Sequence, residues 1–456
     1  MTTREKDIYS ELEKFGVRDR DQQDRLIALV EKLVTDQLKP HQISSDKKTS
    51  RIGDVEKILG KKDENVATVL RRDFIERTTG VELRHAGTFS IDMNETSHDG
   101  LTIGAAQVPI KYVGKVRVNG EYARGEYPVF FAALEGDLAA GAARGIGTFN
   151  KAGGVTTVIK KDGMTRDVLV ELENIIEAKK LYKWIESDQG QKFLEERFNS
   201  KTEHGRFIEA EPYMHGKHVH IVYRASTGAS MGMNILTKFG KEVTDEMMEY
   251  VSDPKTGFLE KITLLTPSGN MCTDKKPTHK NFLEGRGMSI EAEANLPIEL
   301  VKERFFKEDI TPEEAAYRLV KVNVEKNERG TRLAGSVAAN THVANALAAI
   351  YLAYGQDVAQ IVEGSLAVIE LELTKDRKYV YVHGSFPVIE IGTYRGETMW
   401  GTQKELLKAT GVYGEGDDKG TTRFRAGEIF VSAALATDVN LTGNQAAGTH
   451  GSTRLK

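Results

Sequence analysis

Several features that define large classes of proteins are missing from this chain. Among its 456 residues there is one cysteine, Cys272, which excludes an internal disulfide framework and paired-cysteine metal sites. No run of about 18 apolar residues occurs, so the sequence predicts no membrane span. The net charge of -4 provides no basic field for nucleic acid. With no apolar signal core at the N-terminus and so little cysteine, the protein is expected in the cytoplasm.

What is present is the composition of an ordinary globular protein. Hydrophobic residues make up 39% of the chain and charged residues 29%, as in typical folded domains. The length corresponds to roughly three domains. No GxGxxG follows an expected strand, which argues against a Rossmann-type nucleotide site.

The first 80 residues have the pattern of helices. Leu26, Val30 and Leu33 recur at helical spacing. Gly80 is expected to end the last of these helices. Because apolar stripes usually mark a core, we interpret this region as a helical domain for packing or oligomerisation.

Beyond this region the apolar period shortens to that of strands. Residues 113–118 and 122–130 flank Asn119-Gly120, a dipeptide typical of hairpin turns. A further strand is expected at residues 155–160, and a turn at Asp162-Gly163 follows it.

Residues 168–265 have the pattern of one compact α+β unit. The expected order of helix, two strands, helix and strand suits a small open sandwich with its helices on one face. These elements are expected at residues 172–185, 207–213, 218–223, 231–251 and 261–265.

Residues 288–456 have the pattern of a second, larger α+β region. A long apolar helix, buried on most sides, is predicted at residues 334–354. Strands are predicted at 367–373 and 379–388, and the tail after Arg423 is predicted to be helical.

The segment from Ser268 to Pro277 contains the most informative chemistry. Asp274, Lys275 and Lys276 follow one another in a loop bounded by glycine and proline. Such a loop can hold a cation against a developing oxyanion, although solvated charged turns are also common. The neighbouring Lys276 disfavours protonation of Lys275, and Asp274 opposes that effect.

Three further residues are candidates from their local context. Glu135 begins a segment, 134–144, whose small side chains predict a closely packed helix; its alternative role is that of a helix cap. Asp357 follows the long apolar helix and is either an ordinary helix terminus or a carboxylate with a raised pKa. Arg166 follows the turn at 162–163 and can clamp a carboxylate with two donors.

A cluster of histidines, His215, His218 and His220, raises the question of a metal site. In a strand, His218 and His220 share one face while His215 lies across a turn. No carboxylate stands at ligand spacing, so we interpret the cluster as part of a surface strand and expect no metal.

The loop sequence SGNMCTDKKP at residues 268–277, followed by EGRG at 284–287, resembles the cis-loop of class I 3-hydroxy-3-methylglutaryl-CoA (HMG-CoA) reductases. Further similar blocks occur in the order of that family, between about residue 68 and residue 450. They are LEG at 134–136, DGMTR at 162–166, MGMN at 231–234, HVAN at 342–345 and GQDVAQ at 355–360. The loop run is the most specific block, and it favours class I over class II.

The resemblance implies an α+β fold. It consists of a large domain built around a long central helix, an inserted small ferredoxin-like cofactor domain and an N-terminal helical domain. The implied boundaries are 1–85 for the helical domain, 86–167 with 266–456 for the large domain, and 168–265 for the cofactor domain, with the cis-loop at 266–277. Active sites of this family form between subunits, which implies a homodimer or a dimer of dimers.

The resemblance also implies a reaction, in which two hydride transfers from NADPH or NADH convert HMG-CoA into mevalonate and CoA. Lys275 would stabilise the oxyanion, Glu135 would supply protons, Asp357 would tune both, and His450 would protonate the departing thiolate. The implied substrate-binding residues are Arg144, Arg166, Ser268, Asp274, Lys276 and Asn345. The implied cofactor-binding residues are Thr202, Glu203, His204, Met231, Gly232, Met233 and Asn234.

Cofactor choice depends on Glu203 and its neighbours, because many members of the family have serine with a nearby arginine at this place. A glutamate accepts a hydrogen bond from a ribose hydroxyl and repels a 2′-phosphate. We therefore expect NADH to be used at least as well as NADPH.

Other positions also depart from the family pattern, and they leave two alternatives open. One is a catalytically silent paralogue that binds a CoA thioester or acts as a scaffold; the other is an NAD-linked enzyme running toward mevalonate oxidation. Joint retention of Glu135, Lys275 and Asp357 favours catalysis, since a scaffold has no need for a buried charged triad. The departures are Thr449 inserted before His450, Ala229-Ser230 for Asp-Ala, Gly100-Leu101 for Glu-Asn, and Arg395-Gly396-Glu397 for a glycine triplet.

Overall fold

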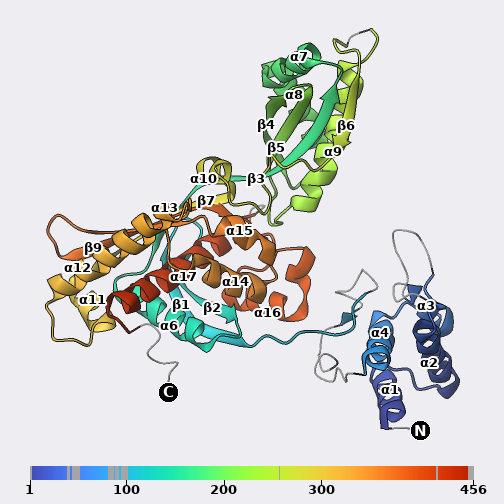
Figure 1. Ribbon diagram of the computed structural model, residues 1–456, viewed down its shortest axis with the longest axis horizontal. Coiled ribbons are helices and arrows are strands. Elements are labelled where there is room, and N and C mark those ends of the chain that lie inside the picture. Colours follow the sequence, from blue (N-terminus) through green and yellow to red (C-terminus); the bar gives the residue numbers. More distant parts are fainter. Residues whose placement is uncertain are drawn as a thin grey trace. The chain divides into compact units, whose positions relative to one another are not determined.

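The computed structural model describes residues 3–38, 42–43, 52–80, 87, 92–93, 101–255, 257–416 and 420–449. The chain forms two compact units, Met1–Pro109 and Ile110–Lys456 (Figure 1). Each unit has a buried apolar core of its own. No helix within the described ranges is long and apolar enough to cross a membrane. The expected cytoplasmic location stays a prediction.

The first unit consists of helices, as its apolar spacing predicted. Asp19 and Asp63 accept hydrogen bonds from backbone N–H groups in the first turns of α2 and α4 and so fix where these helices begin. Gly80 ends α4 with a left-handed φ of 72°, which confirms the predicted stop. Leu26 and Val30 are fully buried in the core. The helices are α1 (Thr3–Lys14), α2 (Arg20–Val34), α3 (Asp54–Leu59) and α4 (Glu64–Thr79).

A seven-stranded antiparallel sheet organises the second unit. Its hydrogen-bonded order is β4-β5-β3-β7-β9-β8, and β6 pairs separately with β3. The strands are β3 (Thr156–Leu172), β4 (Arg206–His215), β5 (His218–Ser226), β6 (Ile262–Thr266), β7 (Arg286–Pro297), β8 (Val368–Leu373) and β9 (Tyr379–Ile389). The five strands expected in the two C-terminal α+β regions are therefore confirmed.

Strand β3 belongs to two lobes of this unit. Residues 156–163 pair with β7, and residues 164–171 pair with β5. The turn predicted at Asp162-Gly163 is therefore wrong, because both residues lie inside the strand where it changes partner. A Cβ at Gly163 would press on the Arg224 side chain, so this glycine permits close packing at the crossover. β3 also runs across the domain boundary predicted at residue 168, and the division into three domains stays a prediction.

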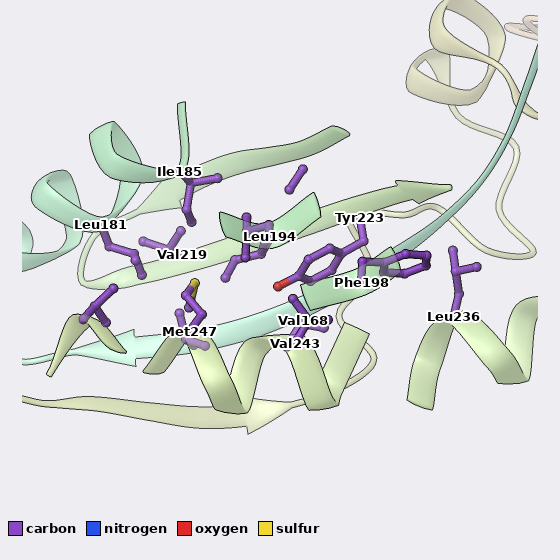
Figure 2. Close-up of a cluster of buried hydrophobic side chains, with 14 of the residues drawn as sticks. Val168, Leu181, Ile185, Leu194, Phe198, Val219, Tyr223, Leu236, Val243 and Met247 are labelled. Atoms are coloured by element: carbon purple, nitrogen blue, oxygen red, sulfur yellow. The ribbon is translucent and has the colours of Figure 1, made fainter. Parts of the chain in front are cut away.

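The smaller lobe contains the second half of β3 with β4, β5 and β6, and three helices pack against these strands. Its apolar core includes Val168, Phe198, Tyr223 and Met247 (Figure 2). The helices are α7 (Ile175–Glu186), α8 (Asp188–Ser200) and α9 (Met233–Val251). The sequence pattern predicted α7 and α9 but not α8, because α8 buries few side chains, chiefly Leu194 and Phe198, within a polar segment.

The larger lobe is built around α17 (Thr421–Ala446), which is buried along most of its length. α6 (Gly136–Lys151) packs on it so closely that a Cβ at Gly145 would overlap the carbonyl oxygen of Ala436. This contact confirms the close packing predicted from the small residues. The predicted hairpin is confirmed as β1 (Ile110–Asn119) and β2 (Arg124–Ala132).

The apolar helix predicted at residues 334–354 begins nine residues later than expected, as α14 (Val343–Tyr354). The helix itself is buried on most sides, as predicted. Before it, the carboxylate of Asp438 in α17 accepts hydrogen bonds from the N–H groups of Thr341 and His342. These N–H groups are thereby satisfied outside a helix, which explains the late start.

The helical tail predicted after Arg423 is confirmed by α17. Shorter elements connect the parts of the chain described so far. They are α10 (His279–Glu284), α11 (Ile298–Phe305), α12 (Pro312–Val322), the π-helix η2 (Asn323–Gly330), α13 (Thr331–Leu333), the 3₁₀ turn η3 (Val358–Gln360), α15 (Ile361–Gly364), the 3₁₀ turn η4 (Gly396–Met399) and α16 (Gly401–Thr410).

Candidate active site

The cis-loop, residues 266–277, brings the predicted lysine to the predicted aspartate. Lys275 Nζ lies 2.9 Å from Asp357 Oδ2. Asp357 begins η3, where its other carboxylate oxygen accepts the N–H of Ala359 at 3.0 Å. The side chains of Lys275 and Asp357 are 43% and 32% exposed. A ligand can therefore reach this ion pair.

The neighbouring acid, Asp274, points into the protein and is held from three sides. Arg286 Nη1 lies 3.0 Å from its Oδ1, and Arg166 Nη1 lies 3.5 Å from its Oδ2. Gln360 Nε2 donates to Oδ1 at 3.2 Å. The loop therefore has one acid turned inward as an anchor and one lysine turned outward.

The charge state of Lys275 is set by Asp357 and not by the adjacent lysine. The hydrogen bond to Asp357 raises the pKa of Lys275 above its ordinary value, with further support from the charges of Asp274 and Glu363. Lys276 turns its own Nζ to the backbone oxygen of Asp274 at 3.0 Å. The opposing effects expected from the sequence thus resolve in favour of the protonated form.

Glu135 immediately precedes α6, and Arg144 lies within it. Glu135 is the residue before the first turn, with an exposed side chain that makes no capping hydrogen bond to the helix. Glu135 therefore occupies the N-cap position considered from the sequence, where the helix dipole favours its charge, but it forms no cap hydrogen bond through its side chain. Arg144 follows nine residues later, roughly 14 Å along the axis and on the opposite side of the helix. The helix thus directs these two residues to different surroundings.

The remaining predicted substrate residues are exposed. Ser268 lies at the start of the cis-loop, where its N–H donates to Thr266 Oγ1 at 3.1 Å. Asn345 lies in the first turn of α14. His450 lies outside the described residues.

A cavity of about 440 Å³ is lined by residues of both lobes. Three of the predicted cofactor residues, Thr202, Glu203 and His204, form part of its wall in the turn after α8. The block Met231–Asn234 forms the start of α9 next to lining residues, with Gly232 in a left-handed conformation at φ 91°. The volume lies within the range of small-molecule sites.

The larger lobe contributes Arg395 and Glu415 to the lining of the cavity. Arg395 stands where the family pattern has glycine, and its backbone adopts φ 72° and ψ 167°, a combination found almost solely in glycine. The substitution therefore keeps a glycine-like path and adds a guanidinium to the wall. The N–H of Thr393 donates to the carbonyl of Ala229 at 2.8 Å, which joins this loop to the turn before α9.

One of the clustered histidines has a buried partner that the sequence did not reveal. His220 Nδ1 lies 2.7 Å from Asp167 Oδ2. That oxygen also accepts the N–H of Met271 at 2.8 Å, so Asp167 anchors the cis-loop from β3. Burial raises the pKa of Asp167. Across the ranges described, no three histidines, cysteines or acids are grouped as metal ligands.

A second lysine with an unusual environment lies in η2. Burial lowers the pKa of Lys326, and its Nζ donates to Asn327 Oδ1 at 2.8 Å and to Thr341 Oγ1 at 3.2 Å. These contacts place it just before α14, the helix that carries Asn345. π-helical turns often occur at functional sites, but nothing in the spacing of this polar segment singled it out.

Fold and site together define an α+β enzyme in which a loop lysine paired with an aspartate occurs in the same unit as a ligand-sized cavity. The family model described as hydroxymethylglutaryl-coenzyme A reductase matches residues 67–452. The 3-hydroxy-3-methylglutaryl-coenzyme A reductase of Pyrococcus abyssi is 36% identical over 416 residues, 91% of this chain and 94% of that protein. That of Methanothermobacter thermautotrophicus is 40% identical over 386 residues, 84% of this chain and 91% of that protein.

The structure of the class II reductase from Streptococcus pneumoniae bound to NADPH matches with a TM-score of 0.59 and 16% identity, over 82% of this chain and 96% of that chain. This match supports the fold alone. The chain belongs to the hydroxymethylglutaryl-coenzyme A reductase family, which confirms the resemblance found in the sequence. Its activity is the conversion of HMG-CoA into mevalonate, a reaction for which the family uses NAD(P)H, so the silent paralogue is set aside.

Replacing Asp357 by asparagine is expected to lower the pKa of Lys275, because the carboxylate is the main cause of its elevation. In the wild type, the ion pair stabilises the fold below the ordinary pKa of lysine, and this contribution is lost as the pH rises through the elevated value. NMR of lysine labelled with ¹³C at Cε measures the titration, with Lys275→Ala giving the assignment. Asp376→Asn, on the β8–β9 turn, is the control. An unchanged Lys275 titration in Asp357→Asn would contradict the expected result.

Proposed function

We propose that Lys275, Glu135 and His450 are the catalytic residues of this reductase and that Asp357 keeps Lys275 protonated. The observation that carries the proposal is the Lys275–Asp357 pair at 2.9 Å, partly exposed at the surface of an anchored loop. A lysine held in this way is a preorganised positive charge. Such charges stabilise the oxyanions formed when acyl carbons are attacked.

The reaction has two reductive halves, and a bound nicotinamide supplies the hydride for each. When the thioester carbonyl is reduced, Lys275 stabilises the negative charge on its oxygen. The carbon–sulfur bond then breaks, and the CoA thiolate takes a proton from His450. When the resulting aldehyde is reduced, Glu135 donates the proton that completes the alcohol. Asp357 maintains the charge of Lys275 through both halves.

The free carboxylate of the substrate is assigned to Arg166 and Lys276. The Arg166 side chain is 13% exposed, and its buried Nε has no hydrogen-bond partner among the described residues, so the guanidinium is not saturated by the protein groups around it. An arginine guanidinium can bind a carboxylate through two parallel N–H donors. Ser268, Asn345 and Arg144 are retained as further substrate contacts from the family resemblance.

The change Lys275→Ala is expected to lower kcat by about 100- to 1000-fold, the usual cost of removing one oxyanion-stabilising group. The KM for HMG-CoA should change little, because the lost interaction forms mainly in the transition state. HMG-CoA-dependent oxidation of the nicotinamide, followed by absorbance, measures both constants. The control is Lys261→Ala, an exposed lysine of the smaller lobe paired with Glu173. Near-normal kcat in Lys275→Ala would refute the assignment.

For the cofactor, we assign the smaller lobe as the inserted domain, the 440 Å³ cavity as its site, and NADH as a donor used at least as well as NADPH. Glu203 lines this cavity, and a carboxylate there accepts from a ribose hydroxyl while it repels a 2′-phosphate. Arg395, which lines the cavity from the larger lobe, suits the diphosphate that both cofactors share. The two side chains therefore favour NADH without excluding NADPH.

Glu203→Ala should raise the ratio of kcat/KM for NADPH to kcat/KM for NADH by about tenfold, which corresponds to about 1.4 kcal/mol of removed repulsion. Steady-state kinetics with each cofactor gives the ratio. Glu415→Ala removes a second acid from the lining of the same cavity and is expected to change the ratio less than about threefold, because a general field effect is screened. A wild type that strongly prefers NADPH, or equal effects of the two variants, would refute a specific role for Glu203.

The assembly is assigned as a homodimer or a dimer of dimers with active sites shared between chains. Large apolar side chains are exposed in this part of the larger lobe: Leu134, the residue before Glu135, is 81% exposed, and Tyr112 on β1, which pairs with β2, is 58% exposed. Exposed apolar surface beside a proposed catalytic residue fits a face that a partner subunit covers.

Mixing the two inactive variants Lys275→Ala and Glu135→Gln tests whether each active site takes Lys275 from one chain and Glu135 from the other. After subunit exchange, half of the dimers are mixed, and each mixed dimer has one intact site. Activity should therefore recover to about a quarter of the wild-type level. Recovery is measured after mild denaturation and refolding together, with separately refolded variants as controls. No recovery, despite mixed dimers seen by mass spectrometry, would place both residues in one chain.

A further inference from the structure

Three side chains at a spacing of three attach the short segment 357–363 to the cis-loop. Asp357 pairs with Lys275 Nζ, Gln360 donates to Asp274, and Glu363 Oε1 accepts the backbone N–H of Lys275 at 2.7 Å. A 3₁₀ turn has three residues per turn, so its use at η3 places such residues on one side. The GQDVAQ block ends at Gln360, and the contact from Glu363 extends the same face by one step.

The hydrogen bond from Lys275 to Glu363 holds a strained backbone. Lys275 and Thr273 both have φ 57°, a left-handed conformation that costs a residue with a side chain roughly 1–2 kcal/mol. Such strain persists only where surrounding contacts enforce it. The Lys275 side chain is 43% exposed, so packing around it does not supply this constraint, whereas the bond to Glu363 acts on its peptide directly.

Glu363 is fixed in turn by a buried arginine. Its side chain has no exposure, and its Oε1 lies 3.2 Å from Arg286 Nη1. The same Nη1 lies 3.0 Å from Asp274 Oδ1, and Arg286 Nε donates to Thr165 Oγ1 of β3 at 3.1 Å. One guanidinium therefore ties the carboxylates on either side of the Lys275 peptide to the central strand.

The charges of this cluster balance when one carboxyl group keeps its proton. Three cations, Arg166, Lys275 and Arg286, face four carboxyl groups, which are those of Asp274, Asp357, Glu363 and Glu390. Burial raises the pKa of Glu390 well above its ordinary value, and the charge of Glu363 adds to the shift. Burial raises the pKa of Glu363 as well, but the Lys275 N–H, the Glu390 carboxyl and the charge of Arg286 oppose that shift, so Glu363 is the carboxylate better suited to accept from Lys275 and Arg286.

We propose that Glu363 is a positioning residue for Lys275: it accepts the Lys275 N–H and so sets where the ammonium group lies beside Asp357. Because Glu363 is buried, it acts on the substrate only through the lysine. This inference rests on the role proposed above for Lys275.

Three substitutions at one position separate the hydrogen bond from the charge. Glu363→Gln keeps an acceptor oxygen and removes the charge; Glu363→Asp keeps the charge but withdraws the oxygen by roughly 1.5 Å; Glu363→Ala removes both. We expect Glu363→Ala and Glu363→Asp to lower kcat by about 10- to 100-fold, since a displacement of this size costs up to about 100-fold. Glu363→Gln should stay within about fivefold of wild type. The KM for HMG-CoA should change less than about threefold in all three.

A matched control is a buried glutamate of the same unit that also accepts backbone N–H groups. Glu428 in α17 has no exposure and accepts from Glu121, Tyr122 and Ala123 in the β1–β2 turn. Glu428→Ala should lower the melting temperature without changing kcat more than about threefold. A loss of kcat at Glu363 therefore reflects more than lost stability.

The results that would overturn the proposal are specific. If Glu363→Ala folds and keeps kcat within threefold of wild type, Glu363 does not position the lysine. If Glu363→Gln loses as much kcat as Glu363→Asp, an acceptor oxygen at this position does not preserve the activity, and the hydrogen bond is not what positions the lysine; this comparison decides the question even if the alanine variant fails to fold. Lys275→Ala in the same assay distinguishes failure of the proposed function from failure of this inference. An active Lys275→Ala variant refutes the proposed catalytic role of Lys275. An inactive Lys275→Ala variant together with an active Glu363→Ala variant refutes only the positioning role of Glu363.

Discussion

A single buried guanidinium, that of Arg286, connects parts of the site that are far apart in the sequence. It contacts Asp274 in the cis-loop, Glu363 in α15 and Glu390 after β9, and it also contacts Met233 at the start of α9. Burying a charge of this kind is unfavourable unless its hydrogen bonds are satisfied, and removing one partner then costs about 3–5 kcal/mol. Arginine suits the position because its five donors can serve several acceptors at once. The order of the cis-loop therefore depends on a group that never meets solvent.

The same group and one strand also link the two lobes of the second unit. β3 pairs with β7 in the larger lobe and with β5 in the smaller lobe. Arg286 stands at the start of β7 and reaches both Thr165 of β3 and Met233 of the predicted cofactor block. A change in the packing of α9 therefore acts on the same side chain that anchors Asp274. The loop that carries Lys275 and the predicted cofactor block therefore both contact one buried side chain.

Sequence reasoning succeeded where a signal is local. The stop at Gly80, the hairpin at Asn119-Gly120 and the motif residues Lys275 and Asp357 are all marked by neighbouring residues. It failed where a side chain far away in the sequence determines the local structure. The start of α14 is set by Asp438, and the attachment of the loop by Asp167 and Glu363, whose partners lie about a hundred residues away. Asp162-Gly163 has the composition of a turn, yet tertiary pairing keeps it extended. Neither the hydrophobic period nor the spacing of residues in the sequence predicts these long-range contacts.

The cis-loop is fixed by buried polar groups, whereas its Lys275–Asp357 ion pair is partly exposed and can interact with a ligand. Arg286, Glu363 and Glu390 have no exposed side-chain surface, so their contacts are costly to break and fix the loop backbone. The Lys275–Asp357 pair is partly exposed, and exposed ion pairs contribute only about 0–1 kcal/mol. An oxyanion can therefore compete for the Lys275 ammonium without disturbing the loop. If the exposure were reversed, with the lysine buried and the anchors in water, the loop would move while its ammonium stayed unavailable. The distribution of exposure is thus what allows one short loop to be rigid in its backbone and still available in its side chain.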